Sequence, residues 1–384
     1  MRRLAAFLIS LVALAATLWW FRVPTTVAVL WDIADGPAGR GGHRGAEPAR
    51  STVSVDVSGR PLPADLYAPA DPGGAGLVLL PGLTAQGKAD ERLVDFALNL
   101  ARAGFTVLVP DLSGRATLSA GTADVPEILA TVAHLSDRLG GRQVGLVGIS
   151  YAVGPAILAA LEPAGRERVA TLVSFGGYHD LTHMVAWVTT GQRRGPDGAW
   201  IKGSVPDLAV WFFVAGNVRL LNDPIDRHLL NEMARRRWND ATVPVGDLAA
   251  RLGPEGQAVF ALLTNRDPEA VPSLIGTLPE RLRAELAALD LSKRDLKALP
   301  ARLVLVHGKD DPVIPWTESV SLAAATDPAR TDLFLIGKMG HTEVGGIGLS
   351  DALDLWRAIS AVLGERERLE EQTGPRASGT GAGR

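Results

Sequence analysis

The chain has 384 residues, a formal net charge of -3 and no cysteine. This length accommodates one large domain or two of ordinary size, and hydrophobic residues at 47% suffice for a large core. The slightly acidic balance argues against a nucleic-acid partner, and the lack of cysteine excludes disulfides and thiolate metal sites.

The first predicted element is an apolar segment near the amino end. Leu4 to Phe21 carries no charge, and as a helix it would span about 27 Å at 1.5 Å per residue, close to the minimum for crossing a bilayer. We expect residues 1–31 to form a membrane anchor, with Arg2 and Arg3 in the cytoplasm and the rest of the chain on the non-cytoplasmic side. The alternative is a signal peptide cleaved after Ala13-Leu-Ala15, which would release a secreted protein.

A linker and a strand-rich region follow. Residues 32–50 are rich in glycine, alanine, proline and arginine, which is typical of a linker. Alternating or continuous apolar runs then predict strands at 52–57, 62–67, 76–80 and 105–109. The first two form a hairpin, and the last two are typical of strands buried on both faces. A helix is predicted between them, over Asp90 to Ala103.

The centre of the chain holds a strand, a tight turn and a helix in succession. Val144 to Val147 is an apolar run of strand type, Gly148-Ile-Ser-Tyr-Ala152 fits G-x-S-x-G/A, and an apolar segment of helix type follows. A strand that turns sharply into a helix exposes the residue at the turn, here Ser150. The same pattern at 348–352 has no strand before it, so Ser350 is interpreted as the N-cap of the last helix.

The remaining elements complete the predicted fold. Asp124 to Glu127 has the spacing of a capping box ahead of a helix. Further strands are predicted at 169–175, 302–307 and 332–336, and a last helix over 350–363. Buried strands that alternate with amphipathic helices predict an α/β fold, a doubly wound and mostly parallel sheet with helices on both faces. We assign residues 51–177 and 300–364 to this core, 178–299 to a helical cap between the sixth and seventh strands, and 365–384 to a disordered tail.

Three polar residue types follow strands of this predicted sheet. Ligands of such sheets sit beyond the carboxyl ends of the strands. Ser150 follows the fifth strand, Asp310 and Asp311 the seventh, and His341 the eighth. The order Ser, Asp, His is the one in which this architecture supplies a nucleophile, an orienting acid and a base. A neutral imidazole takes the hydroxyl proton as the serine attacks, and the carboxylate fixes the tautomer of the imidazole.

Two positions compete for the role of the acid. Asp311 is preferred to Asp310 because it opens the string Asp-Pro-Val-Ile-Pro, whereas Asp310 is expected to form a turn. The alternative is His179-Asp180, after the sixth strand. His307 is expected to be buried within its strand.

The oxyanion of the reaction needs backbone donors. The expected N–H groups are those of Tyr151, directly after the nucleophile, and Leu83, in the turn after the third strand. The chain contains no H-E-x-x-H and no G-x-x-x-x-G-K-S/T. No metal and no cofactor are therefore expected.

These pieces together resemble the α/β-hydrolase superfamily, over about residues 52–363. The matching segments are Leu77-Val-Leu-Leu-Pro-Gly82, Gly148-Ile-Ser-Tyr-Ala152, His307-Gly-Lys-Asp-Asp-Pro-Val-Ile-Pro315 and Gly340-His341. The region around residues 66–83 resembles the dienelactone-hydrolase and carboxylesterase-like branches. One departure is Pro81, where many relatives carry histidine in the oxyanion turn, but a backbone N–H donor is little affected by that change.

The resemblance implies a serine hydrolase that cleaves a carboxylic ester through an acyl-enzyme, with Ser150, Asp311 and His341 as its triad. A lipophilic ester is expected because the predicted cap is rich in tryptophan and phenylalanine and could roof an acyl pocket. Acyltransferase and peptidase chemistry would use the same triad. A non-catalytic protein that binds hydrophobic ligands on this fold is a second class. The expected partners are thus a small-molecule ester and, through the amino-terminal segment, a membrane.

Overall fold

The computed structural model describes residues 47–71, 73–84, 86–114, 121–195, 197–206, 208–337, 340 and 349–371. The predicted anchor, most of the predicted linker and His341 lie outside these residues. Within the described ranges, no helix is both long and apolar enough to cross a bilayer.

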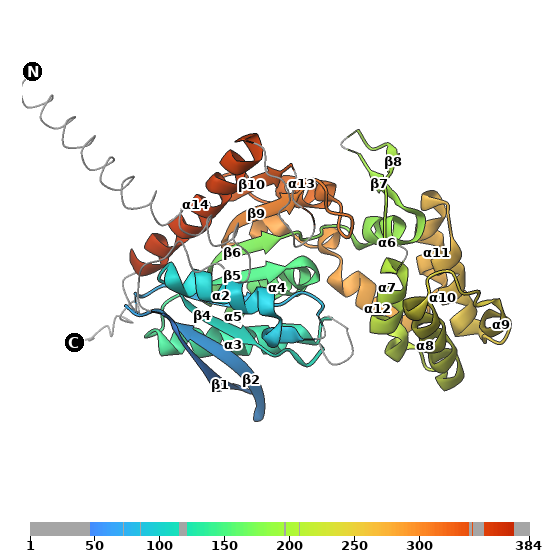
Figure 1. Ribbon diagram of the computed structural model, residues 1–384, viewed down its shortest axis with the longest axis horizontal. Helices are drawn as coiled ribbons and strands as arrows, with labels where there is room; N and C mark the ends of the chain where they lie inside the picture. Colours follow the sequence, from blue (N-terminus) through green and yellow to red (C-terminus); the bar gives the residue numbers. More distant parts are fainter. Residues whose placement is uncertain are drawn as a thin grey trace, which may run out of the picture.

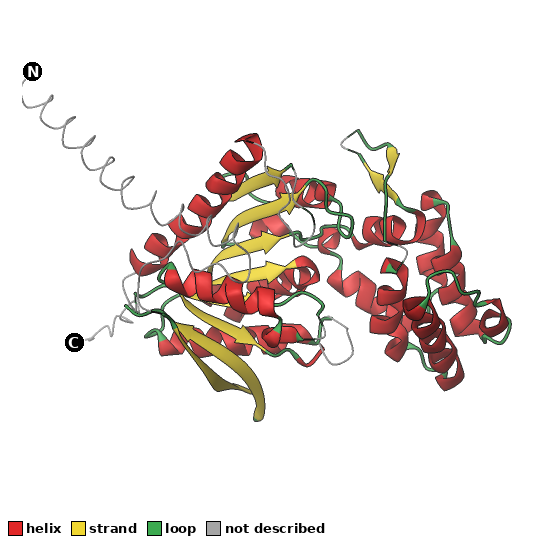
Figure 2. Cartoon of the chain, in the orientation of Figure 1, coloured by secondary structure: helices red, strands yellow, loops and turns green. Residues whose placement is uncertain are grey.

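An eight-stranded sheet lies at the centre of the described chain (Figures 1 and 2). Its strand order is β1-β2-β4-β3-β5-β6-β9-β10. The strands are β1 Ala49–Val57, β2 Arg60–Ala68, β3 Gly76–Leu80, β4 Thr106–Pro110, β5 Val144–Ile149, β6 Val169–Phe175, β9 Arg302–Gly308 and β10 Thr331–Ile336. β2 pairs antiparallel with β1 and with β4, and every other pair is parallel. The predicted doubly wound, mostly parallel sheet is confirmed.

The two faces of the sheet have separate cores. Val78 and Leu80 of β3 pack in the cluster that contains residues of α3 (Asp124–Arg138) and α4 (Val153–Leu161). Leu77 and Leu79 pack in the cluster that contains residues of α2 (Glu91–Arg102) and α14 (Leu349–Glu371). Side chains alternate along a strand, so a strand covered on both faces is a continuous apolar run in the sequence. The helices of the core are α2 Glu91–Arg102, α3 Asp124–Arg138, α4 Val153–Leu161, α5 Pro163–Arg168, α13 Trp316–Ala325 and α14 Leu349–Glu371.

The segment between β6 and β9, here called the insertion (residues 178–299), is largely helical. Figure 1 shows it beyond the end of the sheet at which β6 leads into α6. Its helices are α6 Leu181–Thr190, α7 Ala209–Asn217, α8 Pro224–Asn239, α9 Gly246–Ala249, α10 Pro254–Thr264, α11 Val271–Thr277 and α12 Glu280–Leu289. It also holds a hairpin of β7 Gln192–Arg194 and β8 Trp200–Lys202, which was not predicted because three-residue strands give too short an alternation.

Single-turn 3-10 helices connect these elements. They are η2 Gly87–Ala89, η4 Ser150–Ala152, η5 Val218–Leu220, η6 Pro268–Ala270, η7 Leu291–Lys293 and η8 Leu296–Ala298.

The ends of the folded core differ from the prediction. β1 begins at Ala49, so residues 49–50, predicted as linker, belong to the first strand. α14 extends to Glu371, so residues 365–371, predicted as part of a disordered tail, are helical. The reason is burial, because Glu365 and Leu369 are 3% and 0% exposed on this helix.

Two predicted helix caps are wrong. α3 has Ala123 at its N-cap without a side-chain cap bond, and Asp124 is already helical. The carboxylates of the expected capping box are used elsewhere: Asp124 accepts from the N–H of Gly121 at 3.2 Å, and Glu127 accepts from that of Ser113 at 2.8 Å. Ser350 lies inside α14, one residue after its start, and is not its N-cap.

Candidate active site

Ser150 stands at the junction of β5 and the helical segment η4–α4. Its φ is 57°, a left-handed conformation that costs an L-residue about 1–2 kcal/mol. The turn is tight, because a Cβ on Gly148 would lie 2.9 Å from the Cα of Val153. Backbone strain of this kind concentrates at functional positions. The predicted strand–turn–helix context of Ser150 is confirmed.

The turn after β3 lies against the Ser150 turn. β3 and β5 run parallel with Leu80 opposite Gly148, so the two chains leave the sheet side by side. A Cβ on Gly82 would lie 3.5 Å from the Cβ of Ser150 and 3.5 Å from the carbonyl oxygen of Ile149. The backbone that follows Gly82 therefore starts next to the side chain of Ser150.

The two predicted oxyanion donors flank Ser150 on these two turns. Leu83 follows Gly82 directly, and its side chain is exposed. The N–H of Tyr151 lies at the amino end of the η4–α4 segment, where the helix dipole favours negative charge. The segment after Leu83 is tied to β2, because Lys88 Nζ donates to buried Asp65 at 2.7 Å. The donor roles of Leu83 and Tyr151 stay predictions.

The turn after β9 holds the predicted acid. Asp311 is buried, whereas Asp310 is exposed. One carboxylate oxygen of Asp311, Oδ1, accepts from the backbone N–H of Val313 at 2.8 Å and of Ile314 at 3.0 Å. This side-chain-to-backbone turn fixes the carboxylate relative to its own loop. Asp310 lies in a turn, as expected, and the catalytic role of Asp311 stays a prediction.

The predicted base, His341, lies outside the described residues. The strand before it, β10, is parallel to β9, with Ile336 opposite Gly308. The chain therefore leaves β10 at the same edge of the sheet as the turn that carries Asp311.

The alternative acid, Asp180, has a structural role in the described chain. It is the N-cap of α6 and accepts from the N–H groups of Thr182 at 2.8 Å and His183 at 3.1 Å. Glu318 of α13 accepts from the N–H groups of His179 at 2.9 Å and Asp180 at 2.8 Å. Burial raises the pKa of Glu318 to about 7, although these two backbone donors lower it. Nothing in the sequence pattern pointed to Glu318 as the residue that pins the β6–α6 loop.

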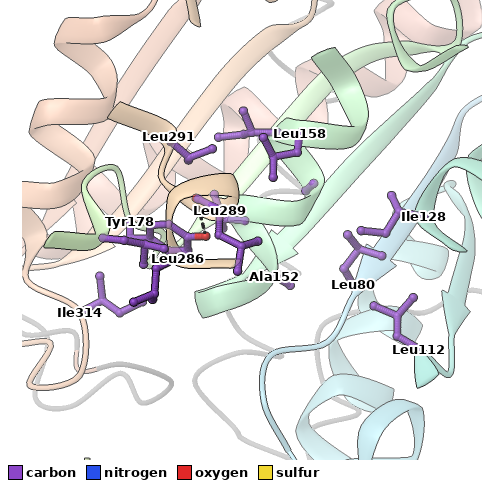
Figure 3. Close-up of a cluster of buried hydrophobic side chains, with 14 of the residues drawn as sticks. Leu80, Leu112, Ile128, Ala152, Leu158, Tyr178, Leu286, Leu289, Leu291 and Ile314 are labelled. Carbon is purple, nitrogen blue, oxygen red and sulfur yellow. Dashed lines mark hydrogen bonds between the residues drawn. The ribbon is translucent and has the colours of Figure 1, made fainter. Parts of the chain in front are cut away.

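Apolar side chains line one side of the Ser150 turn. The ring of Tyr178 lies 5.7 Å from that of Tyr151 between centroids, and its hydroxyl donates to the carbonyl of Leu289 at 3.2 Å. Burial raises the pKa of Tyr178 well above its ordinary value, so the phenol stays protonated and remains a donor. Figure 3 shows Tyr178, Leu286 and Leu289 gathered near Ala152. The insertion thus contributes apolar side chains next to the predicted nucleophile.

The insertion is bonded to the core on both sides of β5. On the β4 side, the N–H and Oγ1 of Thr122 donate to the carboxylate of Glu285 at 2.7 and 2.9 Å. On the β9 side, the indole N–H of Trp187 donates to the carbonyls of Pro312 and Val313 at 3.3 and 3.2 Å. These contacts fix where the insertion stands relative to the predicted catalytic residues.

A cavity of about 190 Å³ opens in the insertion between α6, α11 and α12. Leu181, Val185, Ile275 and Leu286 form part of its apolar lining, and none of the predicted catalytic residues does. Among the residues that the structure describes, no group of three or more metal-ligating side chains could hold a metal ion.

Comparisons with known proteins agree with this architecture. The sequence pattern of the alpha/beta hydrolase family matches residues 77–346. A 2-hydroxymuconate semialdehyde hydrolase of Pseudomonas putida is 29% identical over 208 residues, which make up 53% of this chain and 58% of that hydrolase. The match therefore spans less than two thirds of the length of that relative.

The solved structures that match are more distant in sequence. A meta-cleavage product hydrolase of Pseudomonas fluorescens is 22% identical, with a TM-score of 0.43 over 82% of this chain and 97% of that one. The dienelactone hydrolase of Anabaena variabilis is 16% identical, with a TM-score of 0.42 over 82% of this chain and 96% of that one.

Proposed function

Since the chain belongs to the alpha/beta hydrolase family, we propose that it is a serine hydrolase that cleaves a carboxylic ester through an acyl-enzyme intermediate. The observation that carries the proposal is the left-handed conformation of Ser150 at the carboxyl end of a central parallel strand. A strained, tightly turned serine at this place is what a nucleophile needs to stand clear of the sheet.

In the proposed mechanism, the imidazole of His341 takes the hydroxyl proton of Ser150 as its oxygen attacks the ester carbonyl. The backbone N–H groups of Leu83 and Tyr151 donate to the resulting oxyanion. The imidazolium, stabilised by Asp311, then gives its proton to the leaving alcohol, and the acyl-enzyme remains. Water attacks this intermediate with the same imidazole as base, and the free acid leaves.

Labelling with a fluorophosphonate probe tests this function, because such probes form a bond only with an activated serine. We expect labelling of the wild type and none of Ser150→Ala. Ser350→Ala is the matched control, because Ser350 occupies the second G-x-S-x-A sequence and should leave labelling unchanged. Circular dichroism checks that both variants are folded. A folded wild type that takes up no probe favours a non-catalytic ligand-binding protein on this fold.

A lipophilic acyl group is the proposed substrate class. The support is the apolar side of the site, where Tyr178, Leu286 and Leu289 lie near Ala152. Each buried CH₂ contributes about 0.8 kcal/mol, so kcat/KM should rise up to about 15-fold per added pair of carbons until the pocket is filled. A series of p-nitrophenyl esters from acetate to decanoate measures this. Fastest turnover of the acetate would contradict a deep acyl pocket.

A second candidate activity is hydrolysis of 2-hydroxymuconate semialdehyde. The Pseudomonas putida relative that is 29% identical over 208 residues is named for this reaction. Turnover of this compound, with kcat/KM above that of the best ester, would favour the second candidate. Acyl transfer would be detected as formation of a new ester when an alcohol is added to the assay. Peptide cleavage would be detected as turnover of a peptide amide.

We also propose that residues 1–31 anchor the chain in a membrane, with the remainder on the non-cytoplasmic side. The support is the uncharged run from Leu4 to Phe21, preceded by Arg2 and Arg3. The full chain should then stay with the membranes in carbonate extraction, and a variant without residues 1–31 should not. Recovery of the intact full chain in the extract would contradict an anchor.

A further inference from the structure

His307 is a buried histidine next to the predicted acid that the proposed mechanism does not use. It lies in β9 and is 0% exposed, as its place in an apolar strand predicted. Its Nε2 lies 2.9 Å from the carbonyl oxygen of Ile314, and its Nδ1 lies 2.6 Å from Oγ of Ser319. Both ring nitrogens therefore have partners inside the core.

The partners of His307 determine where its proton sits. The carbonyl of Ile314 can only accept, so Nε2 carries the hydrogen and donates it. In this tautomer Nδ1 is an acceptor, and the hydroxyl of Ser319 donates to it. The same Nε2 lies 3.5 Å from the second carboxylate oxygen of Asp311, Oδ2. His307 is thus fixed by α13 and holds the far end of the turn that carries Asp311.

Trp187 holds the same turn from the side of the insertion. It is buried on α6, and its indole N–H is shared between the carbonyls of Pro312 and Val313 at 3.3 and 3.2 Å. The space around its ring is filled, because a Cβ on Gly203 would lie 2.5 Å from the ring. The indole therefore has little room to move away from the turn.

The hydrogen bonds of Trp187 and His307 act on Asp311 through three consecutive peptide groups of the turn. The residues whose N–H groups hold Oδ1 of Asp311 are Val313 and Ile314. The peptide groups that contain these two N–H donors also contain the carbonyls of Pro312 and Val313, and both carbonyls accept from Trp187. The carbonyl of Ile314, in the next peptide group, accepts from His307. A shift of either peptide held by Trp187 would change the direction of the donors that fix the carboxylate, and His307 restrains the peptide that adjoins them.

We propose that His307 and Trp187 are positioning residues, which hold the turn from Gly308 to Pro315 so that the carboxylate of Asp311 keeps its orientation toward the catalytic base. The inference rests on the proposed function and adds to it a connection between the insertion and the acid. Both side chains are buried, so their proposed role is to position the turn. Because Trp187 belongs to the insertion, the placement of the insertion and the alignment of the acid depend on each other.

Steady-state kinetics of two variants test this inference. His307→Phe keeps a ring and removes both hydrogen bonds, and Trp187→Phe keeps an aromatic ring and removes the indole donor. A misplacement of about 1 Å costs about 100-fold in rate, so kcat for a p-nitrophenyl ester should fall about 10- to 100-fold, with KM within about twofold. The acidic limb of the pH profile of kcat/KM should also move to lower pH, because a poorly oriented carboxylate stabilises the imidazolium less. His307→Asn, which retains a donor toward Ile314, should recover part of kcat.

The matched control is Thr171→Val. Thr171 is buried in β6, and its hydroxyl donates to Glu365. Removing this hydrogen bond should lower the melting temperature of the protein and leave kcat and the pH profile unchanged. A variant that acts only through stability would behave in the same way.

The possible results distinguish failure of the proposed serine hydrolase function from failure of the positioning roles alone. No fluorophosphonate labelling of the wild type overturns the proposed function itself. Ser150-dependent labelling, together with folded His307→Phe and Trp187→Phe variants that keep the wild-type kcat and pH profile, overturns the positioning roles alone. If His307→Phe does not fold, Trp187→Phe and His307→Asn decide the question by the same two readouts.

Discussion

Asp124 carries a buried carboxyl group, and only one of its two oxygens accepts a hydrogen bond from a described residue. It is 3% exposed, one of its oxygens accepts from the N–H of Gly121 at 3.2 Å, and the other has no hydrogen-bond partner among the residues that the structure describes. Burial, with smaller contributions from Glu127 and Glu285, raises the pKa of Asp124 from 3.8 to about 6, although Gly121 and Arg219 lower it. A negative charge at this position therefore destabilises the folded chain.

The sign and size of the effect follow from proton binding. Between pH 3.8 and about 6 the folded state binds this proton more tightly than the unfolded state. Stability from this group is therefore full below pH 3.8 and is lost as the pH rises through about 6. At 1.36 kcal/mol per pKa unit, the loss is about 3 kcal/mol. Asp124→Asn removes the charge and keeps an acceptor for Gly121, so it should raise the free energy of unfolding at pH 8 by up to this amount.

Urea unfolding followed by tryptophan fluorescence at pH 4 and pH 8 measures the difference. The gain of Asp124→Asn should be present at pH 8 and nearly absent at pH 4, where the wild-type carboxyl is protonated. Asp137→Asn, an exposed change on the same helix, should stay within about 0.5 kcal/mol of the wild type at both pH values. A variant at Asp124 that is less stable than the wild type at pH 8 would refute the reasoning.

Two further predictions concern the turn at Ser150 and the buried carboxylate of Asp65 in β2. Ser150→Gly should be more stable than Ser150→Ala by about 1 kcal/mol in thermal melts, because glycine adopts the left-handed φ of 57° without strain. Equal stability of the two variants would mean that the backbone at Ser150 is not strained. Asp65→Asn should cost about 3 kcal/mol, because it leaves Lys88 and Arg50 without their buried partner. Burial raises the pKa of Asp65, but hydrogen bonds from Lys88 and Arg50 keep it below its ordinary value. The stabilisation that the ionised carboxylate provides is therefore lost as the pH falls. In urea unfolding, the free energy of unfolding of Asp65→Asn should decrease less at acidic pH than that of the wild type.

The tight turn at Ser150 and the parallel sheet could be predicted because the sequence patterns that indicate them are local. Val144 to Ile149 is a continuous apolar run, since both faces of β5 are covered. A Cβ at position 148 would clash with Val153, so the glycine found there indicates a tight turn. Motif and context together predict the tight turn at Ser150 from the sequence alone.

The contacts that hold the turn of Asp311 could not be predicted, because they join distant parts of the chain. Trp187 and Val313 are 126 residues apart, and no periodicity links them. Glu318 and His179 are 139 residues apart for the same reason. The charged sequence at the end of α14 predicts a tail, and only the burial of Leu369 in the core cluster shows why this segment is helical.

The most direct measurement of the central claim is rapid mixing of the protein with a p-nitrophenyl ester, combined with mass spectrometry of the quenched protein. The account predicts a burst of p-nitrophenol that approaches one equivalent per chain, and an acyl adduct on the peptide that contains Ser150. Steady turnover without an adduct on that peptide, or an adduct that persists in Ser150→Ala, would contradict it.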